Sequence, residues 1–172
     1  MLVGEATVVA DDPANDIAIL KLKPKRPTTL FALPLARHGA TLGENVFTLG
    51  YPAPEVLGPQ VKMTAGLVNS TAGAEGDTRF LQMSVQVQPG NSGGPVMAWD
   101  ASVVGVVDWG IDKLPDERAA QNVNYAVKTS YVRAMLEDLP DLGNYAYVRP
   151  TGDHQALVSA ARKAVFMLVV TQ

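Results

Sequence analysis

The chain has 172 residues, a length that suits one domain or two small lobes, and a formal net charge of −3 at pH 7. Hydrophobic residues make up 47% and charged residues 18% of it, which is typical of a globular chain and excludes a disordered one. The acidic balance argues against a nucleic-acid partner, because such proteins usually present a basic face. The absence of cysteine excludes disulfides, thiolate metal sites and a cysteine nucleophile.

Targeting and membrane signals are weak. Residues 1–20 contain no basic segment followed by an apolar core, so we expect no signal peptide in them. The most apolar run, residues 164–170, is too short to cross a bilayer, which needs about 20 residues. We therefore expect a soluble chain with no membrane span, and its localisation stays unknown.

Short apolar runs bounded by Gly, Pro, Asn or Asp recur along the chain, as is typical of antiparallel β structure. Several are continuous and rich in Val, which suits strands buried in a small barrel. In chain order, the sequence predicts strands at residues 6–10, 16–22, 45–49, 61–69, 80–87, 96–98, 103–107 and 122–127. Residues 23–43, between the second and third strands, carry KPKRP and no clear periodicity, so we expect a connector there.

The C-terminal part is predicted to be helical. Residues 131–139 have apolar side chains at helical spacing, with Thr129 or Ser130 as the expected N-cap and Pro140 as the end. Residues 155–163 form a second candidate helix, and a closing strand that could fill a free sheet edge is expected after it.

The segment QVQPGNSGGPV, residues 86–96, places a serine between an asparagine and two glycines, directly before an apolar strand. Gly and Asn adopt backbone angles closed to other residues, so such a loop can aim consecutive backbone N–H groups at one point. Ser92 is therefore a candidate nucleophile beside an oxyanion hole, and the alternative is an ordinary turn serine. A phosphate loop is not favoured, because no Lys follows and no helix signal opens there.

The segments ANDIAILKL, residues 14–22, and PGNSGGPV, residues 89–96, together resemble the chymotrypsin-fold (trypsin-like) serine proteases. The likeness is strongest to the cysteine-free bacterial branch that includes the HtrA/DegP group, and it covers much of residues 7–136. It implies an all-β, chymotrypsin-like double β-barrel with a complete C-terminal barrel, a partial N-terminal barrel and a C-terminal helix. The implied division is residues 1–22 for the last strands of the N-terminal barrel, 23–43 for the connector, 44–128 for the C-terminal barrel and 129–172 for the helix and tail.

The resemblance also implies roles for single residues. Ser92 would be the nucleophile, Asp16 would hold the base in its correct tautomer, and the N–H groups of Gly90 and Ser92 would form the oxyanion hole. For Asp16, the alternative is an aspartate that begins a strand after the turn DDPAN. A polypeptide substrate would bind as an added strand, with no metal or cofactor. The implied substrate-binding residues are Gln86, Asp108, Trp109 and Gly110.

The pattern lacks its general base. The family order is His, Asp, Ser, yet no residue before Asp16 is histidine, and the strands that would complete the N-terminal barrel are missing as well. We expect His38 to be a solvated connector residue, and His154 has no family position to match. The chain is then a truncated piece of a longer enzyme, a pseudoprotease, or one part of a site completed by another polypeptide. Truncation is favoured because Asp16, Ser92 and the oxyanion loop look intact.

A second departure is Asp108, where the chymotrypsin-like pattern has serine before Trp-Gly. A carboxylate there would lie close to Asp16, so one of the two pKa values should rise. Gln86 carries no charge, which does not support a preference for Lys or Arg, and a small or medium apolar residue is expected before the scissile bond.

The predicted function is that of a serine endopeptidase acting by acyl transfer. The alternatives are a catalytically inactive, peptide-binding pseudoprotease and a structural β-domain in which GNSGGP is only a turn. A truncated first barrel would also expose strand edges, which predicts self-association.

Overall fold

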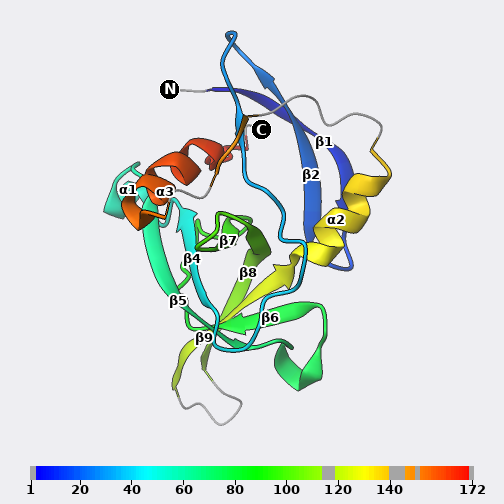
Figure 1. Cartoon of the computed structure of the whole chain (residues 1–172), viewed down its shortest axis with the longest axis vertical. Coiled ribbons are helices and arrows are strands. Elements are labelled where there is room, and N and C mark those ends of the chain that lie inside the picture. The colour runs from blue at the N-terminus through cyan, green and yellow to red at the C-terminus, as the bar shows by residue number, and fades with distance from the viewer. Residues whose placement is uncertain (1–2, 114–118, 140–145, 150–151, 171–172) are drawn as a thin grey trace.

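The computed structural model describes residues 3–113, 119–139, 146–149 and 152–170, and its largest unit is a closed six-stranded barrel (Figure 1). The strand order around the barrel is β4-β5-β6-β9-β8-β7, with antiparallel neighbours. This confirms the predicted all-β class and the complete C-terminal barrel. The strands are β4 (Asn45–Gly50), β5 (Lys62–Ser70), β6 (Phe80–Met83), β7 (Pro95–Ala98), β8 (Val103–Lys113) and β9 (Ala119–Lys128).

The inside of the barrel is one apolar cluster built from alternate residues of its strands. Val46, Val96 and Val107 are each at most 2% exposed, and the β-branched side chain of valine fits a pleated, buried surface well. Thr48 is also fully buried, and its hydroxyl donates to the carbonyl of Pro95 at 2.9 Å, so burial leaves no unpaired hydroxyl there.

The outer face of β4 and β7 is covered by the C-terminal part of the chain. Phe47 and Met97 pack there against α3 (His154–Ala161), which continues into the short helix η2 (Arg162–Ala164). Trp99 follows β7, and its ring centroid lies 4.5 Å from that of Phe47. The two-residue strand β10 (Ala146–Tyr147) pairs in parallel with β3 (Phe31–Ala32) of the connector.

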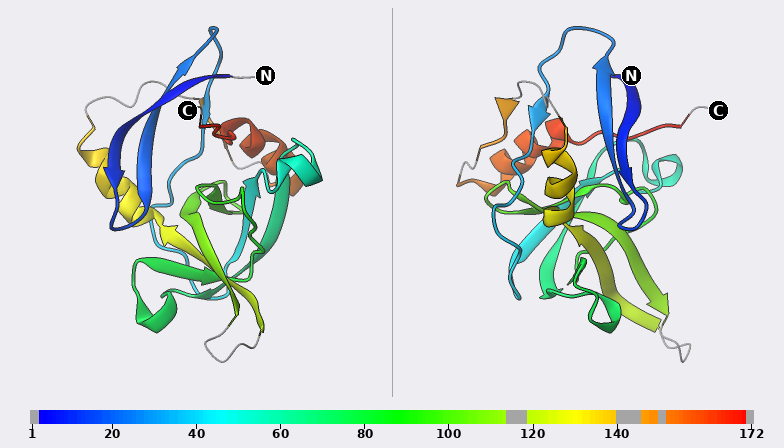
Figure 2. Two further views of the ribbon diagram at one scale, coloured as in Figure 1. Left: turned by 180° about the vertical axis from the view of Figure 1, so that it is seen from behind. Right: turned by 90° about the vertical axis from the view of Figure 1, so that its right-hand side faces the viewer.

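The N-terminal residues form a separate two-stranded hairpin of β1 (Gly4–Asp12) and β2 (Ile17–Pro24). It projects from one end of the barrel in every view (Figure 1, Figure 2). Val8 and Leu20 face each other across it and remain 60% and 39% exposed. A two-stranded sheet is only marginally stable alone, so this hairpin is short of apolar partners within the described residues. The predicted domain boundaries remain a prediction.

Most predicted strands have other bounds in the structure, for example β1 and β9, which are each longer at both ends, and β6 and β8 differ for identifiable reasons. β6 ends at Met83 and not at residue 87, because the Ser84 hydroxyl accepts the N–H of Leu67 at 3.0 Å and interrupts the regular ladder. β8 extends beyond residue 107 to Lys113, since it continues to pair with β9.

The C-terminal predictions were partly wrong. α2 (Thr129–Glu137) has Lys128 and not Thr129 or Ser130 at its N-cap; Thr129 lies inside the helix, and its hydroxyl donates to the carbonyl of Val103 at 2.8 Å. The helix ends at Glu137, and the predicted end at Pro140 lies outside the described residues. No closing strand forms in the described residues 165–170, which are exposed after Val165; apolar sequence alone does not tell whether a sheet edge is within reach.

The shortest elements carry no periodic signal in the sequence. These are β3, β10, α1 (Pro54–Leu57) and η1 (Ala74–Gly76). Among the described helices, none is both long and apolar enough to span a bilayer.

Candidate active site

The loop that carries Ser92 consists of two consecutive tight turns. The N–H of Asn91 donates to the carbonyl of Gln88 at 2.9 Å, and the N–H of Gly94 donates to that of Asn91 at 2.9 Å. Gly90 and Gly93 hold the third position of each turn with φ of 99° and 77°, a region that favours glycine. The GNSGG pattern thus has a direct geometric reason, and it leaves Ser92 exposed.

Close packing on β4 and a backbone hydrogen bond to β8 hold this loop against the barrel. Asn91 is 4% exposed, and a Cβ on Gly50 would lie only 2.4 Å from its Oδ1, so the end of β4 must be glycine for the loop to pack. The N–H of Gly93 donates to the carbonyl of Val107 at 2.8 Å, which holds the loop against β8. Within the described residues, the N–H groups of Gly90 and Ser92 donate to no backbone carbonyl, as an oxyanion hole requires.

Ser92 meets β8 at the start of the predicted substrate strand. Its Oγ donates to the backbone carbonyl of Asp108 at 3.1 Å. The pairing of β8 with β7 ends at Val106, whereas its pairing with β9 resumes at Gly110, so among the described strands residues 108–110 have one free edge. Trp109 is 42% exposed on this segment, with its ring centroid 4.7 Å from that of Tyr125.

Asp16 lies at the end of the β1–β2 turn, in the left-handed region at φ 51°. The turn is organised by Asp12, whose carboxylate accepts the N–H of Ala14 at 3.1 Å and the side-chain amide of Asn15 at 2.5 Å. Arg79, from the loop before β6, donates to the carbonyl of Ala14 at 2.5 Å. This contact ties the turn that holds Asp16 to the barrel.

The structure brings Asp16 and Asp108 into electrostatic contact. Partial burial raises the pKa of Asp108, and the negative charge of Asp16 raises it further, whereas the positive charge of Arg79 opposes the shift. The expectation that these two carboxyl groups would raise one pKa is therefore confirmed in direction. Burial is the larger cause, which the sequence did not indicate.

This shift predicts how pH acts on stability. The raised pKa means that the folded chain binds the Asp108 proton more tightly than the unfolded chain does. The stabilising contribution is complete below the unfolded pKa of about 3.9 and is lost as pH rises through the folded pKa. Relative to wild type, Asp108→Asn is expected to gain stability as pH rises from about 3 to 7, in urea unfolding at each pH. A difference that stays constant with pH would contradict the shift.

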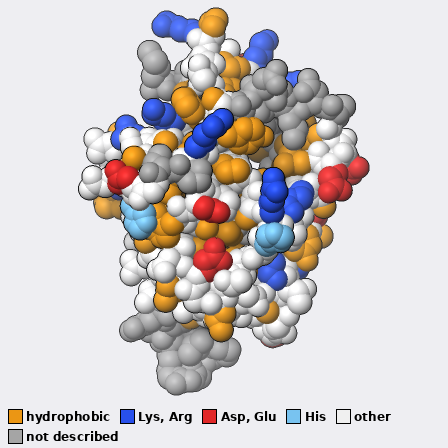
Figure 3. All heavy atoms as spheres, viewed as in Figure 1, with side chains coloured by type: hydrophobic (Ala, Val, Ile, Leu, Met, Phe, Trp, Pro, Cys, Tyr) orange, Lys and Arg blue, Asp and Glu red, His pale blue; other side chains and the backbone are white. Residues whose placement is uncertain are grey.

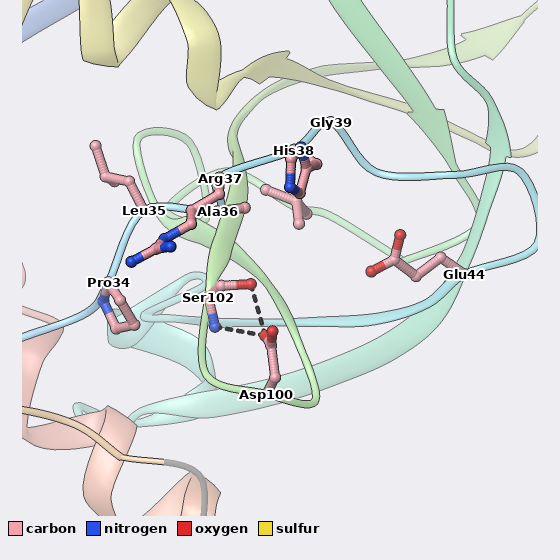
Figure 4. A pocket seen from close by; sticks show the side chains of 10 residues that line it. Pro34, Leu35, Ala36, Arg37, His38, Gly39, Glu44, Asp100 and Ser102 are labelled. Atoms are coloured by element: carbon pink, nitrogen blue, oxygen red, sulfur yellow. Dashed lines mark hydrogen bonds between the residues drawn. The ribbon is translucent and has the colours of Figure 1, made fainter.

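Both histidines lie in surroundings that do not include Ser92. His38 lines a pocket of about 480 Å³ between the connector and the β7–β8 turn, together with Arg37 and Asp100 (Figure 4). The ring of His154 stacks on Trp99 with centroids 3.9 Å apart. Trp99 and Asp100 follow β7, whereas Ser92 precedes it, so both histidines belong to the opposite end of that strand. In the space-filling view, the two histidines lie apart from each other among charges of both signs (Figure 3).

The remaining predicted residues divide into two groups. Trp109 and Gly110 lie on the free edge of β8 beyond Ser92. Gln86 is exposed, and its backbone carbonyl accepts the Thr64 hydroxyl at 2.8 Å, but no described contact joins its side chain to Ser92. No group of three His, Asp or Glu side chains that could hold a metal ion occurs in the described part of the chain.

The sequence and the fold of this chain are similar to those of known proteins. A family model described as a trypsin-like peptidase domain matches residues 3–106. The chain belongs to the trypsin-like peptidase family. It is 25% identical to the inactive form of a serine-to-alanine mutant of Rv3671c from M. tuberculosis, with a TM-score of 0.56 over 80% of this chain and 68% of that one. The serine endoprotease from Yersinia pestis gives a TM-score of 0.60 at 23% identity over 79% of this chain and 44% of that one, which confirms the chymotrypsin-like fold.

Relatives in sequence include members of the HtrA/DegP group. The chain is 33% identical over 109 residues to a probable periplasmic serine endoprotease, DegP-like, from Pseudomonas fulva, which covers 59% of this chain and 21% of that protein. It is 39% identical over 135 residues to protein y4bJ of Sinorhizobium fredii, covering 76% of this chain and 21% of that protein. The chain thus spans about a fifth of the length of these curated relatives.

Sequence reasoning missed three residues that shape this candidate site. Arg79 holds the turn before Asp16, Gly50 makes room for Asn91, and Asn124 packs against Gly110. Their positions depend on contacts between segments far apart in the chain. Only Gly50 left a signal, as a glycine in an otherwise apolar strand, which often marks a close backbone approach.

Proposed function

We propose that this chain carries the nucleophile and the oxyanion hole of a serine endopeptidase. In this proposal, Ser92 Oγ attacks the substrate carbonyl, and the N–H groups of Gly90 and Ser92 stabilise the oxygen that becomes negative. The observation that carries the proposal is the position of Ser92. It is exposed, in a double turn fixed to the barrel, and directly beside the free edge of β8.

The substrate is a polypeptide held as an added strand on residues 108–110. Backbone hydrogen bonds to a free strand edge supply affinity that is largely independent of sequence, while the side chains supply specificity. In the structure, the Asp108 carbonyl accepts the Ser92 hydroxyl at 3.1 Å. An added strand would use the same carbonyl and release that hydroxyl toward the substrate.

In this proposal, the general base is a histidine that lies outside the 172 residues, and Asp16 orients its imidazole ring. Support comes from the distant positions of His38 and His154 and from the turn of Asp16, which Arg79 holds close enough for Asp16 to affect the pKa of Asp108. The proton of Ser92 then passes to the imidazole, and from there to the leaving amine when the C–N bond breaks. Water hydrolyses the acyl-enzyme by the same route in reverse.

Chemical complementation tests this proposal on the 172-residue chain. Free imidazole is expected to raise the rate at which a fluorophosphonate labels Ser92 by about tenfold or more, because general-base catalysis contributes about 10²- to 10⁴-fold when the base is positioned. Asp16→Asn should weaken this rescue, while Asp11→Asn, also on the hairpin, should not. If imidazole leaves the rate unchanged, Ser92 is not poised for a missing base.

A peptide-binding pseudoprotease is the second candidate, and one observation favours it. The Ser92 hydroxyl is hydrogen-bonded to a backbone carbonyl and to no base among the described residues. Such a protein would bind peptides on the β8 edge with equal affinity in wild type and Ser92→Ala, and would stay unlabelled with imidazole present.

A further inference from the structure

Arg79 joins two parts of the chain that share few other contacts. Its Nη1 donates to the carbonyl of Ala14 in the β1–β2 turn at 2.5 Å. Among the described residues, no other hydrogen bond or ion pair links the β1–β2 hairpin to the barrel. Neither apolar cluster of the barrel includes a hairpin residue. The place of this turn against the barrel therefore depends strongly on one guanidinium group.

The guanidinium of Arg79 is itself held in a fixed direction. Its Nη2 donates to Asp77 Oδ2 at 2.6 Å, and its Nε lies within 3.1 Å of both oxygens of that carboxylate. The backbone of the same loop is fixed to β9, because the N–H of Lys128 donates to the carbonyl of Arg79 at 3.0 Å and Lys128 Nζ donates to that of Thr78 at 2.6 Å. A forked pair between Arg and a carboxylate sets orientation as well as distance, so the remaining Nη1 is aimed at the turn.

The bond reaches the turn two residues before Asp16. Asp12 accepts hydrogen bonds from the N–H of Ala14 and from the side chain of Asn15, so these turn residues move as one unit. The carboxylate of Asp16 accepts no hydrogen bond among the described residues, and its position is therefore set by the turn. Burial and then the charge of Asp16 raise the pKa of Asp108, which indicates that the turn places the two carboxyl groups near each other.

We propose that Arg79 is a positioning residue that acts through Asp16: its guanidinium holds the β1–β2 turn so that the Asp16 carboxylate lies beside Asp108, whose carbonyl accepts the Ser92 hydroxyl. This inference rests on the proposed function, in which Asp16 orients the base. Lysine cannot replace arginine in this role, because a single ammonium group keeps the charge and loses the planar fork. The alternative is a bond that only stabilises the chain.

A double-mutant cycle on the 172-residue chain separates these two roles. The measured quantity is the factor by which imidazole raises the rate of fluorophosphonate labelling at Ser92. Arg79→Lys is expected to lower this factor by about threefold or more. In the Asp16→Asn background, Arg79→Lys should cause no further loss, because both changes remove the same contribution. Losses that multiply independently would overturn the inference.

A second measurement does not depend on labelling. The pKa of Asp108 is followed by NMR of its carboxyl carbon, with and without Asp16→Asn. In the wild-type background, removal of the Asp16 charge should lower the pKa of Asp108. In Arg79→Lys, which keeps the other charge that acts on Asp108, the same removal should have almost no effect, because the released turn no longer holds Asp16 close. An equal lowering in both backgrounds, or none in either, would overturn the inference. Failure of the proposed function is read separately, as labelling that never responds to imidazole while the pKa effect still depends on Arg79.

Arg133→Lys is the matched control. Arg133, on α2, also donates to backbone carbonyls, those of Ala36 and Arg37 in the connector. It contacts neither the β1–β2 turn nor Ser92 through any hydrogen bond among the described residues, so its replacement should leave the imidazole factor and the pKa of Asp108 unchanged. An equal effect of the two lysine variants would show a general loosening of the chain and would contradict a role specific to Arg79.

Discussion

Replacing Ser92 by alanine is expected to abolish hydrolysis by any form of this protein that includes a general base. The expected loss in kcat is about 10⁴-fold or more, because the oxyanion hole alone retains only a small part of the rate enhancement. Peptide affinity should change by less than about twofold, since the β8 edge remains in place. Cleavage of a fluorogenic peptide measures the first quantity, and binding of a product peptide measures the second.

Ser130→Ala is the control for this loss. Ser130 is exposed on α2, and its replacement should leave both quantities unchanged. Equal cleavage by wild type and Ser92→Ala would show that the activity belongs to another group or to a contaminant.

Phe47→Ala is expected to have the largest effect on stability. Phe47 is fully buried between β4 and the C-terminal part, and its ring lies 4.5 Å from that of Trp99. Removing a buried aromatic ring costs about 3–5 kcal/mol in the free energy of unfolding, which is a large part of the stability of a domain. Urea unfolding followed by tryptophan fluorescence measures the loss.

Phe166→Ala provides the same substitution on the surface. Phe166 is 42% exposed in the segment after Val165, so its replacement should change the free energy of unfolding by no more than about 0.5 kcal/mol. Equal losses for the two variants would contradict the packing of the C-terminal part on the barrel.

The nucleophile loop could be predicted because its information is local. Two turns in succession need glycine at their third positions, and Gly90 and Gly93 appear at that spacing around Ser92. Most barrel strands were also predictable, since short apolar runs such as the valine-rich start of β8 place side chains in the core. The raised pKa of one of the two carboxyl groups, Asp108 and Asp16, was also predictable in direction, because both residues lie in recognisable motifs.

The rest depends on contacts that no single segment encodes. Arg79 of the barrel donates to the carbonyl of Ala14 in the hairpin, and the close approach of Asn124 to Gly110 arises only when β9 pairs with β8. The helix α3 has ordinary helical spacing, but its packing on Phe47 through Trp99 and His154 could not be read from it. The stacking of His154 on Trp99 is part of this packing.

The most direct test of the central claim is fluorophosphonate labelling, read by intact mass and peptide mapping. It compares the 172-residue chain with an extended chain that includes the proposed histidine. The account predicts slow labelling of the 172-residue chain, fast labelling of the extended chain at Ser92, and none in Ser92→Ala. Fast labelling at another residue, or an extended chain that labels no faster, would contradict it.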